Sequence, residues 1–149
     1  MNNGYGQPNA EGAEVSQRAQ KENQIVENDW SHEIIGAAVE VQRVLGTGLL
    51  ESAYAAALAI ELNERELAFQ REAPIEAVYR GRSLGVAYRA DFIVEGSVLV
   101  ELKALEATSD LHRAQLLSYL RVSGLRLGLL INFHAFPVVK GIHRVVNKL

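Results

Sequence analysis

Two carboxylates and a lysine fall close together in the segment YRADFIVEGSVLVELKA, residues 88–104. Asp91 lies within the first apolar run of this segment, and Glu101 and Lys103 lie within the second. Neighbouring carboxylates repel each other unless a cation lies between them, and their oxygen atoms suit Mg²⁺ or Mn²⁺. A lysine beside them can hold an attacking water or stabilise charge that develops on a phosphate. The same residues could instead form a salt bridge between two strands, and spacing alone does not separate the two interpretations.

The elements around these residues predict a β-hairpin. Residues 86–94 and 97–104 have the composition of strands and are separated by a Glu-Gly turn signal. Because side chains alternate along a strand, Glu101 and Lys103 share one face, and a hairpin places Asp91 on the strand beside them. We therefore expect the three side chains to converge at one end of a sheet.

A third carboxylate, Glu51, lies in the first turn of a helix predicted over residues 49–66, which is rich in Ala, Leu and Glu. Glu51 is in line with the apolar stripe of this helix, where a carboxylate is costly unless it is paired or bound to metal. The alternative is an ordinary first-turn acid that interacts with the helix dipole. Tyr54 shares this face, where it either supports a site or packs in the core.

The helix predicted over residues 109–123 carries Gln115 and Tyr119 four positions apart, so that they lie on one face. Their polar ends can reach a shared polar site on a partly apolar surface. The alternative is the edge of an ordinary amphipathic helix.

The remaining pattern predicts an α/β domain with a mixed sheet flanked by helices, in the order α-α-β-β-β-α-β-β. Pro74 favours an edge strand, and Gly81 and Gly85 are expected to flank a turn. The predicted elements are helices over residues 31–45, 49–66 and 109–123 and strands over residues 68–79, 86–94, 97–104, 127–133 and 138–146.

The chain has 149 residues, of which 48% are hydrophobic, and no cysteine. This length fits one domain, and the lack of cysteine excludes disulfides, thiolate metal sites and a cysteine nucleophile. Residues 1–28 are rich in Asn, Gln, Gly and Glu, which predicts a disordered polar tail before a single domain over residues 29–149. No apolar run is long enough to span a bilayer, and no secretory signal is evident, so we expect a cytoplasmic protein.

The formal net charge of −3 argues against a strong general affinity for nucleic acid, but the charge is uneven. Residues 104–149 carry six bases and two acids, a surplus that could contact phosphates. Surface charges also scatter in this way by chance. On charge alone, the candidates for phosphate contacts are Arg89, Arg113 and Arg121.

The segment GLLESAY, residues 48–54, fits the signature GxxExxY, and the chain resembles that protein family over residues 31–147. The resemblance extends to EVQRVLGTGLLESAY, YRADFIVEGSVLVELKA and HRAQLLSYLRVSGLRLGLLINF. GxxExxY proteins are grouped with the PD-(D/E)XK nuclease superfamily, which has a restriction-endonuclease-like core. The resemblance therefore implies an α-β-β-β-α-β unit, in agreement with the order predicted above.

Carried over to this sequence, the resemblance implies that Asp91 and Glu101 are metal ligands and that Lys103 is the motif lysine. Glu51 matches the acid on the first core helix that often completes the metal site. These four residues would be the catalytic set, with Mg²⁺, or alternatively Mn²⁺, as the cofactor.

Gln115 and Tyr119 match a QxxxY element that supports the site and contacts substrate in RecB-type nucleases. Tyr54 and Arg89 are further candidates for supporting or contacting substrate. One departure is Gln42, because similar proteins commonly have His at this position, between Val and Arg.

The expected function is metal-dependent hydrolysis of phosphodiester bonds in DNA or RNA. The alternative is a non-catalytic binding or accessory module that retains the nuclease fold, which the small size and acidic charge favour. Nucleic acid is the expected partner, and a homodimer or a protein partner could supply specificity.

Overall fold

The computed structural model describes residues 29–148, so the predicted polar tail over residues 1–28 lies outside the described part of the chain. Within this part, three helices and five strands follow one another in the predicted order, with one short 3₁₀ helix added before the last strand. The elements are α2 (Ser31–Leu45), α3 (Glu51–Glu64), β1 (Phe69–Tyr79), β2 (Arg82–Val94), β3 (Val98–Lys103), α4 (Asp110–Ser123), β4 (Leu127–Asn132), η1 (Val138–Gly141) and β5 (Ile142–Val146). The α/β prediction is confirmed.

The five strands form one mixed sheet in the order β1-β2-β3-β4-β5. Neighbouring strands run antiparallel except for β3 and β4, which are parallel. A parallel pair cannot be joined by a tight turn, and α4 provides the crossover between these two strands. The central strand, β3, is the one that carries Glu101 and Lys103.

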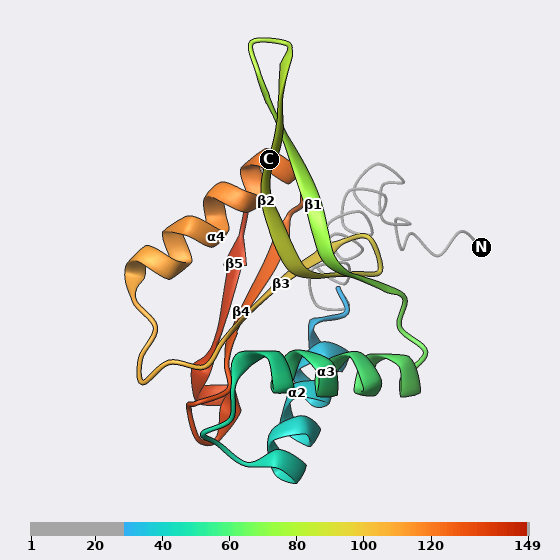
Figure 1. Ribbon diagram of the computed structural model, residues 1–149, viewed down its shortest axis with the longest axis vertical. Helices are drawn as coiled ribbons and strands as arrows, with labels where there is room; N and C mark the ends of the chain where they lie inside the picture. Colours follow the sequence, from blue (N-terminus) through green and yellow to red (C-terminus); the bar gives the residue numbers. More distant parts are fainter. Residues whose placement is uncertain (1–28, 149) are drawn as a thin grey trace, which may run out of the picture.

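Helices cover both faces of the sheet (Figure 1). The core under α2 and α3 includes Tyr54, Leu58 and Phe92, and the core under α4 includes Leu116 and Leu120. β4 is buried at every position, as its apolar run predicts for a strand covered on both faces. None of the helices within residues 29–148 is long and apolar enough to cross a membrane.

The β1–β2 hairpin is longer than predicted and projects from the body of the domain (Figure 1). β2 begins at Arg82 rather than at residue 86, and its ladder with β1 runs to the pair Tyr79–Arg82. Gly85, expected to flank a turn, lies inside β2 with a φ of 78°. Gly85 pairs with Ala77, and the β1–β2 ladder has a register shift on each side of this region. Such bulges allow the pairing of the two strands to continue past a residue with an unusual backbone conformation. Pro74 lies in the edge strand β1, as predicted.

The prediction of one extended segment over residues 138–146 was wrong in its first half, which forms η1. Gly141, the last residue of η1, lies very close to the end of β4. A Cβ on Gly141 would be only 2.6 Å from the carbonyl oxygen of Asn132. Only glycine permits so close an approach of two backbone segments.

Candidate active site

β2 and β3 stop pairing at Asp91 and Glu101. Their ladder runs from the pair Val94–Val98 to the pair Phe92–Val100, and the next two residues interact through side chains instead. The Asp91 carboxylate accepts the N–H of Leu102 at 2.7 Å, and the Asp91 N–H donates to Oε1 of Glu101 at 3.3 Å. Two half-buried carboxylates are therefore fixed side by side where the strands diverge.

The environment of Glu101 disfavours its charged form. Burial is the largest cause that raises the pKa of Glu101, followed by the charge of Asp91 and, more weakly, by a hydrogen bond with the Asp91 side chain, and the pKa is raised to about 8. The N–H of Asp91 and the charge of Lys103 act in the opposite direction. A carboxylate pair of this kind is poised to accept a cation, which would relieve the repulsion.

We expect the metal-free protein to become less stable as the pH rises toward 8, because of Glu101. Its pKa is raised from 4.5 to about 8 on folding, so in this interval the folded protein holds a proton that the unfolded chain has released. The contribution of this group to the free energy of unfolding is complete below about pH 4.5 and is lost as the pH rises through about 8. Thermal unfolding midpoints of wild type and Glu101→Gln, measured with chelator, should diverge in favour of the variant as pH rises. A constant difference between the two proteins would contradict the raised pKa.

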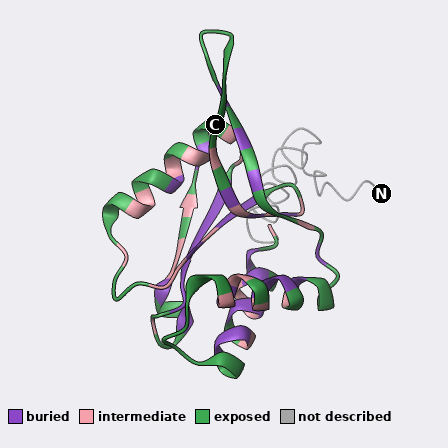
Figure 2. Cartoon of the chain, in the orientation of Figure 1, coloured by how far each residue is buried: buried purple, intermediate pink, exposed green. Residues whose placement is uncertain are grey.

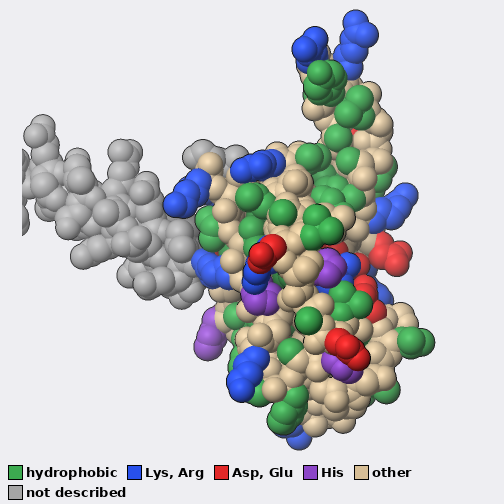
Figure 3. All heavy atoms as spheres, turned by 90° about the vertical axis from the view of Figure 1, so that its left-hand side faces the viewer, with side chains coloured by type: hydrophobic (Ala, Val, Ile, Leu, Met, Phe, Trp, Pro, Cys, Tyr) green, Lys and Arg blue, Asp and Glu red, His purple; other side chains and the backbone are tan. Residues whose placement is uncertain are grey.

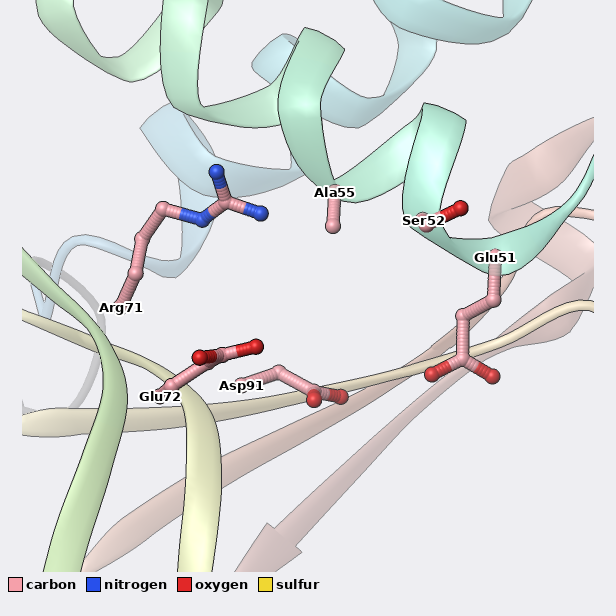
Figure 4. Close-up of a pocket in the computed structure, with 6 residues that line it drawn as sticks. All are labelled: Glu51, Ser52, Ala55, Arg71, Glu72 and Asp91. Carbon is pink, nitrogen blue, oxygen red and sulfur yellow. The ribbon is translucent and has the colours of Figure 1, made fainter.

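Glu51 and Asp91 line one cavity of about 330 Å³ between α3 and the first two strands. Figure 4 shows Glu51 projecting from the start of α3 and Asp91 projecting from β2 into the same opening. Burial and then the charge of Asp91 raise the pKa of Glu51, while the charge of Lys103 lowers it. Glu51 is thus within electrostatic range of both residues, although it is exposed and not buried with the apolar stripe of the helix.

The structure does not gather the three carboxylates into one cluster. Within residues 29–148, no three His, Cys, Asp or Glu side chains lie close enough to hold a metal ion together. Asp91 and Glu101 are adjacent, whereas Glu51 stands on the opposite wall of the cavity (Figure 4). Mg²⁺ is usually held by one or two carboxylates, and water and substrate phosphate complete its shell. The adjacent pair is therefore a suitable donor set.

Lys103 follows Glu101 by two residues on β3, so both side chains lie on the same face of the sheet. The ion pairs in the described part of the chain are Arg43–Glu40, Arg65–Glu61, Arg113–Asp110 and Arg144–Asp29, and none involves Lys103. The cross-strand salt bridge considered from the sequence is thus not formed. Lys103 acts on the carboxylates through space.

Gln115 and Tyr119 reach the Glu101 side of the sheet from α4. Tyr119 stacks on Tyr88 of β2 with ring centroids 3.7 Å apart, and the Tyr88 hydroxyl donates to the Tyr119 carbonyl at 3.0 Å. Burial and then the charge of Glu101 raise the pKa of Tyr119, and a hydrogen bond with the Gln115 side chain lowers it. Burial raises the pKa of Tyr88 to about 12. Tyr88 was not singled out from the sequence, although it is an aromatic residue of the same strand as Asp91.

The cavity contains an arginine that charge counting missed. Arg71, on β1, is the one base among the six lining residues of this cavity, and its guanidinium lies 5.6 Å from the ring centroid of Phe92. Arg89, Arg113 and Arg121 do not line the cavity. Arg71 pairs with Phe92, the residue next to Asp91, in the β1–β2 ladder. This pairing depends on where the hairpin turns, which the sequence alone does not reveal.

Tyr54 is fully buried and does not line the cavity. Its ring stacks on Phe133 at 4.6 Å between centroids. Its hydroxyl donates to the carbonyl of Gly46 at 2.8 Å and accepts the N–H of Leu49 at 3.3 Å. Tyr54 thereby fixes the loop that leads into Glu51.

Gln42 is buried away from the cavity and bonds to the loop after β4. Its Nε2 donates to the carbonyls of Phe133 and Ala135, at 3.1 and 2.6 Å, and its Oε1 accepts the N–H of Val138 at 2.7 Å. The sequence identified this position only as a departure from a histidine. The structure shows an amide that satisfies three backbone groups.

Comparison with known proteins gives one match. A sequence model described as the PD-(D/E)XK nuclease superfamily matches residues 28–145. No curated protein and no solved structure matches the chain. The matched range contains all five strands, except the last residue of β5, and every candidate site residue named above.

Proposed function

The chain belongs to the PD-(D/E)XK nuclease superfamily, and on this premise we propose that it is a metal-dependent phosphodiesterase that hydrolyses DNA or RNA. The observation that carries the proposal is the pair of half-buried carboxylates, Asp91 and Glu101, held where β2 and β3 diverge. Burial and the charge of Asp91 disfavour the charged form of Glu101, and an arrangement of this kind costs stability, so a cation-dependent reaction explains the pair better than a structural role. We also propose that the chain is a GxxExxY protein, on the basis of residues 48–54.

In this proposal Asp91 and Glu101 hold Mg²⁺ or Mn²⁺, and Glu51 contributes from the facing wall of the cavity. A bound divalent ion neutralises phosphate charge and lowers the pKa of water. Lys103 lies on the face of Glu101 and positions the attacking water or stabilises the charge of the transition state. Lys103 makes no ion pair within the described residues, so in this proposal its side chain can contact the substrate.

The residues around this centre take supporting roles in the proposal. Tyr119 lies within electrostatic range of Glu101, and Gln115 hydrogen-bonds to Tyr119; in the proposal these two residues contact substrate or limit how far water reaches the pair. Arg71 is better placed than Arg89 to bind a phosphate, because it lines the cavity. Tyr54 acts indirectly, by fixing the loop before Glu51.

A non-catalytic module that keeps this fold is the second candidate function. It is favoured by the separation of Glu51 from the adjacent pair, since no three metal-binding side chains converge within the described residues. This module would bind its partner without a divalent ion and would tolerate loss of Lys103.

Cleavage of labelled DNA and RNA, single- and double-stranded, with Mg²⁺, Mn²⁺ or chelator tests the choice. We expect metal-dependent cleavage that falls at least about a hundredfold in Lys103→Met, which keeps the length of the side chain and removes its charge. The matched control is Lys140→Met, on the exposed surface of η1, which should retain full activity. Wild-type protein that cleaves none of these substrates and binds no Mn²⁺ would favour the binding module.

A further inference from the structure

The outer part of the β1–β2 hairpin, residues 76–87, stands free of the sheet. β3 pairs with β2 only over Phe92–Val94, whereas the β1–β2 ladder continues to the pair Tyr79–Arg82. Figure 1 shows this two-stranded segment, called the arm below, reaching well beyond the helices. Figure 2 shows that it is exposed along nearly its whole length.

The arm presents large apolar side chains to solvent. Val78, Tyr79, Leu84 and Val86 are each more than half exposed. A two-stranded ribbon is only marginally stable by itself, and a group of exposed apolar side chains marks a contact surface more often than a neutral surface. The arm therefore has the character of a binding element.

The charge of the arm favours an anionic partner. Arg80 and Arg82 flank the tip, and the single acid within residues 76–87 is Glu76, which accepts the hydroxyl of Ser83. Figure 3 shows the basic side chains at the outer end of the arm, with hydrophobic side chains beneath them. Two arms from two copies of the chain would bring four arginines together, whereas a nucleic acid offers phosphates to them.

We propose that the arm is a second nucleic-acid contact, remote from the cavity, which holds the substrate duplex while it is cleaved at Asp91 and Glu101. This inference rests on the proposed function for its choice of polymer. A two-stranded β-ribbon fits the major groove of B-DNA. In this assignment Arg80 and Arg82 bind phosphates, and Tyr79 and Leu84 contact the groove.

The length of the arm sets the substrate that would detect it. Arg82 is nine residues before Asp91, and a strand rises about 3.3 Å per residue, so the tip lies at most about 30 Å from Asp91. That distance corresponds to about nine base pairs of B-DNA. A duplex of about 24 base pairs, about 80 Å long, can therefore span both sites, whereas a hexanucleotide duplex, about 20 Å long, is shorter than this maximal distance.

Fluorescence anisotropy with the long duplex, in chelator so that no cleavage occurs, tests the arm directly. We expect the double variant Arg80→Gln/Arg82→Gln to raise Kd at least about tenfold and to make the slope of log K against log salt shallower by about 2. The matched control, Arg43→Gln/Arg65→Gln, removes the same charge from surface ion pairs of the helices and should leave both quantities near wild type. Equal losses in the two variants, or no loss in the arm variant, would overturn the proposal.

Two further measurements separate this inference from its alternatives. Cleavage of the hexanucleotide should be the same in wild type and in the arm variant, and a parallel loss would show that the substitutions disturb the cavity and would overturn the assignment. If the wild type cleaves nothing, the proposed function fails, but the anisotropy comparison still decides the role of the arm. A dimer that Leu84→Ser converts to monomer, with unchanged duplex affinity in Arg80→Gln/Arg82→Gln, would assign the arm to a second copy of the chain instead.

Discussion

Replacement of Asp91 by Asn is expected to lower metal-dependent cleavage by at least about a thousandfold while the protein stays folded. Asp91 has two functions in the structure: its carboxylate carries charge beside Glu101, and it accepts the N–H of Leu102 at 2.7 Å. Asn keeps an oxygen that can accept this hydrogen bond and loses only the charge. Asp91→Ala loses both, so it should also reduce stability by about 1–3 kcal/mol, because the Leu102 N–H is left without its acceptor.

Calorimetric titration with Mn²⁺ and cleavage assays on the same samples distinguish the two functions. We expect Asp91→Asn to lose Mn²⁺ binding and cleavage together, with an unfolding midpoint close to that of wild type at neutral pH, since Asn still accepts the N–H of Leu102. The matched control is Asp110→Asn, an exposed acid at the start of α4, which should behave as wild type. Full Mn²⁺ affinity in Asp91→Asn would remove this carboxylate from the proposed metal site.

The elements that position the site could be predicted because each has a local periodic signal. The alternation of β3 separates Glu101 and Lys103 from Val100 and Leu102, and that separation is observed in the two faces of the sheet. The helical period of α3 places Glu51 toward the sheet, beside the cavity. Such signals are set by neighbours along the chain, which is why the order of elements was confirmed.

The length of the β1–β2 hairpin could not be predicted, because it depends on pairing between strands. Gly81 and Gly85 both have positive φ, yet one lies at the turn and the other inside β2. A bulge accommodates the second glycine without ending the ladder. From composition alone, both glycines predict a turn. A prediction from the sequence therefore ends the two strands too early and gives a hairpin shorter than the observed one.

The neighbours of the site depend on contacts between distant segments. Arg71 reaches the cavity only because β1 pairs with β2 in this register, and Tyr88 meets Tyr119 across 31 residues of chain. Charge counting favoured Arg89, which lies outside the cavity. Residue type thus identified the carboxylates that we propose for the metal, whereas the residues around them needed the packed structure.

Gln42 gives the largest expected effect on stability. Its amide satisfies the carbonyls of Phe133 and Ala135 and the N–H of Val138, and the side chain is only 6% exposed. Gln42→Leu keeps the approximate volume and removes every hydrogen bond, so up to three buried backbone groups lose their partners. At about 1–3 kcal/mol for each unsatisfied group, we expect the free energy of unfolding to fall by about 3 kcal/mol or more.

Urea denaturation measures this loss, and two further variants identify its cause. Gln42→His, which restores the residue expected from the family resemblance, should lose less than Gln42→Leu, because neutral histidine has one donor and one acceptor against three partners. Gln70→Leu removes an exposed amide from β1 and should change stability by no more than about 0.5 kcal/mol. A loss below about 1 kcal/mol in Gln42→Leu would mean that water or a shifted loop replaces the amide. Because Gln42 lies outside the cavity, the folded fraction of each variant should retain Mn²⁺ affinity, which separates this loop-bonding residue from the carboxylates that we propose for the metal.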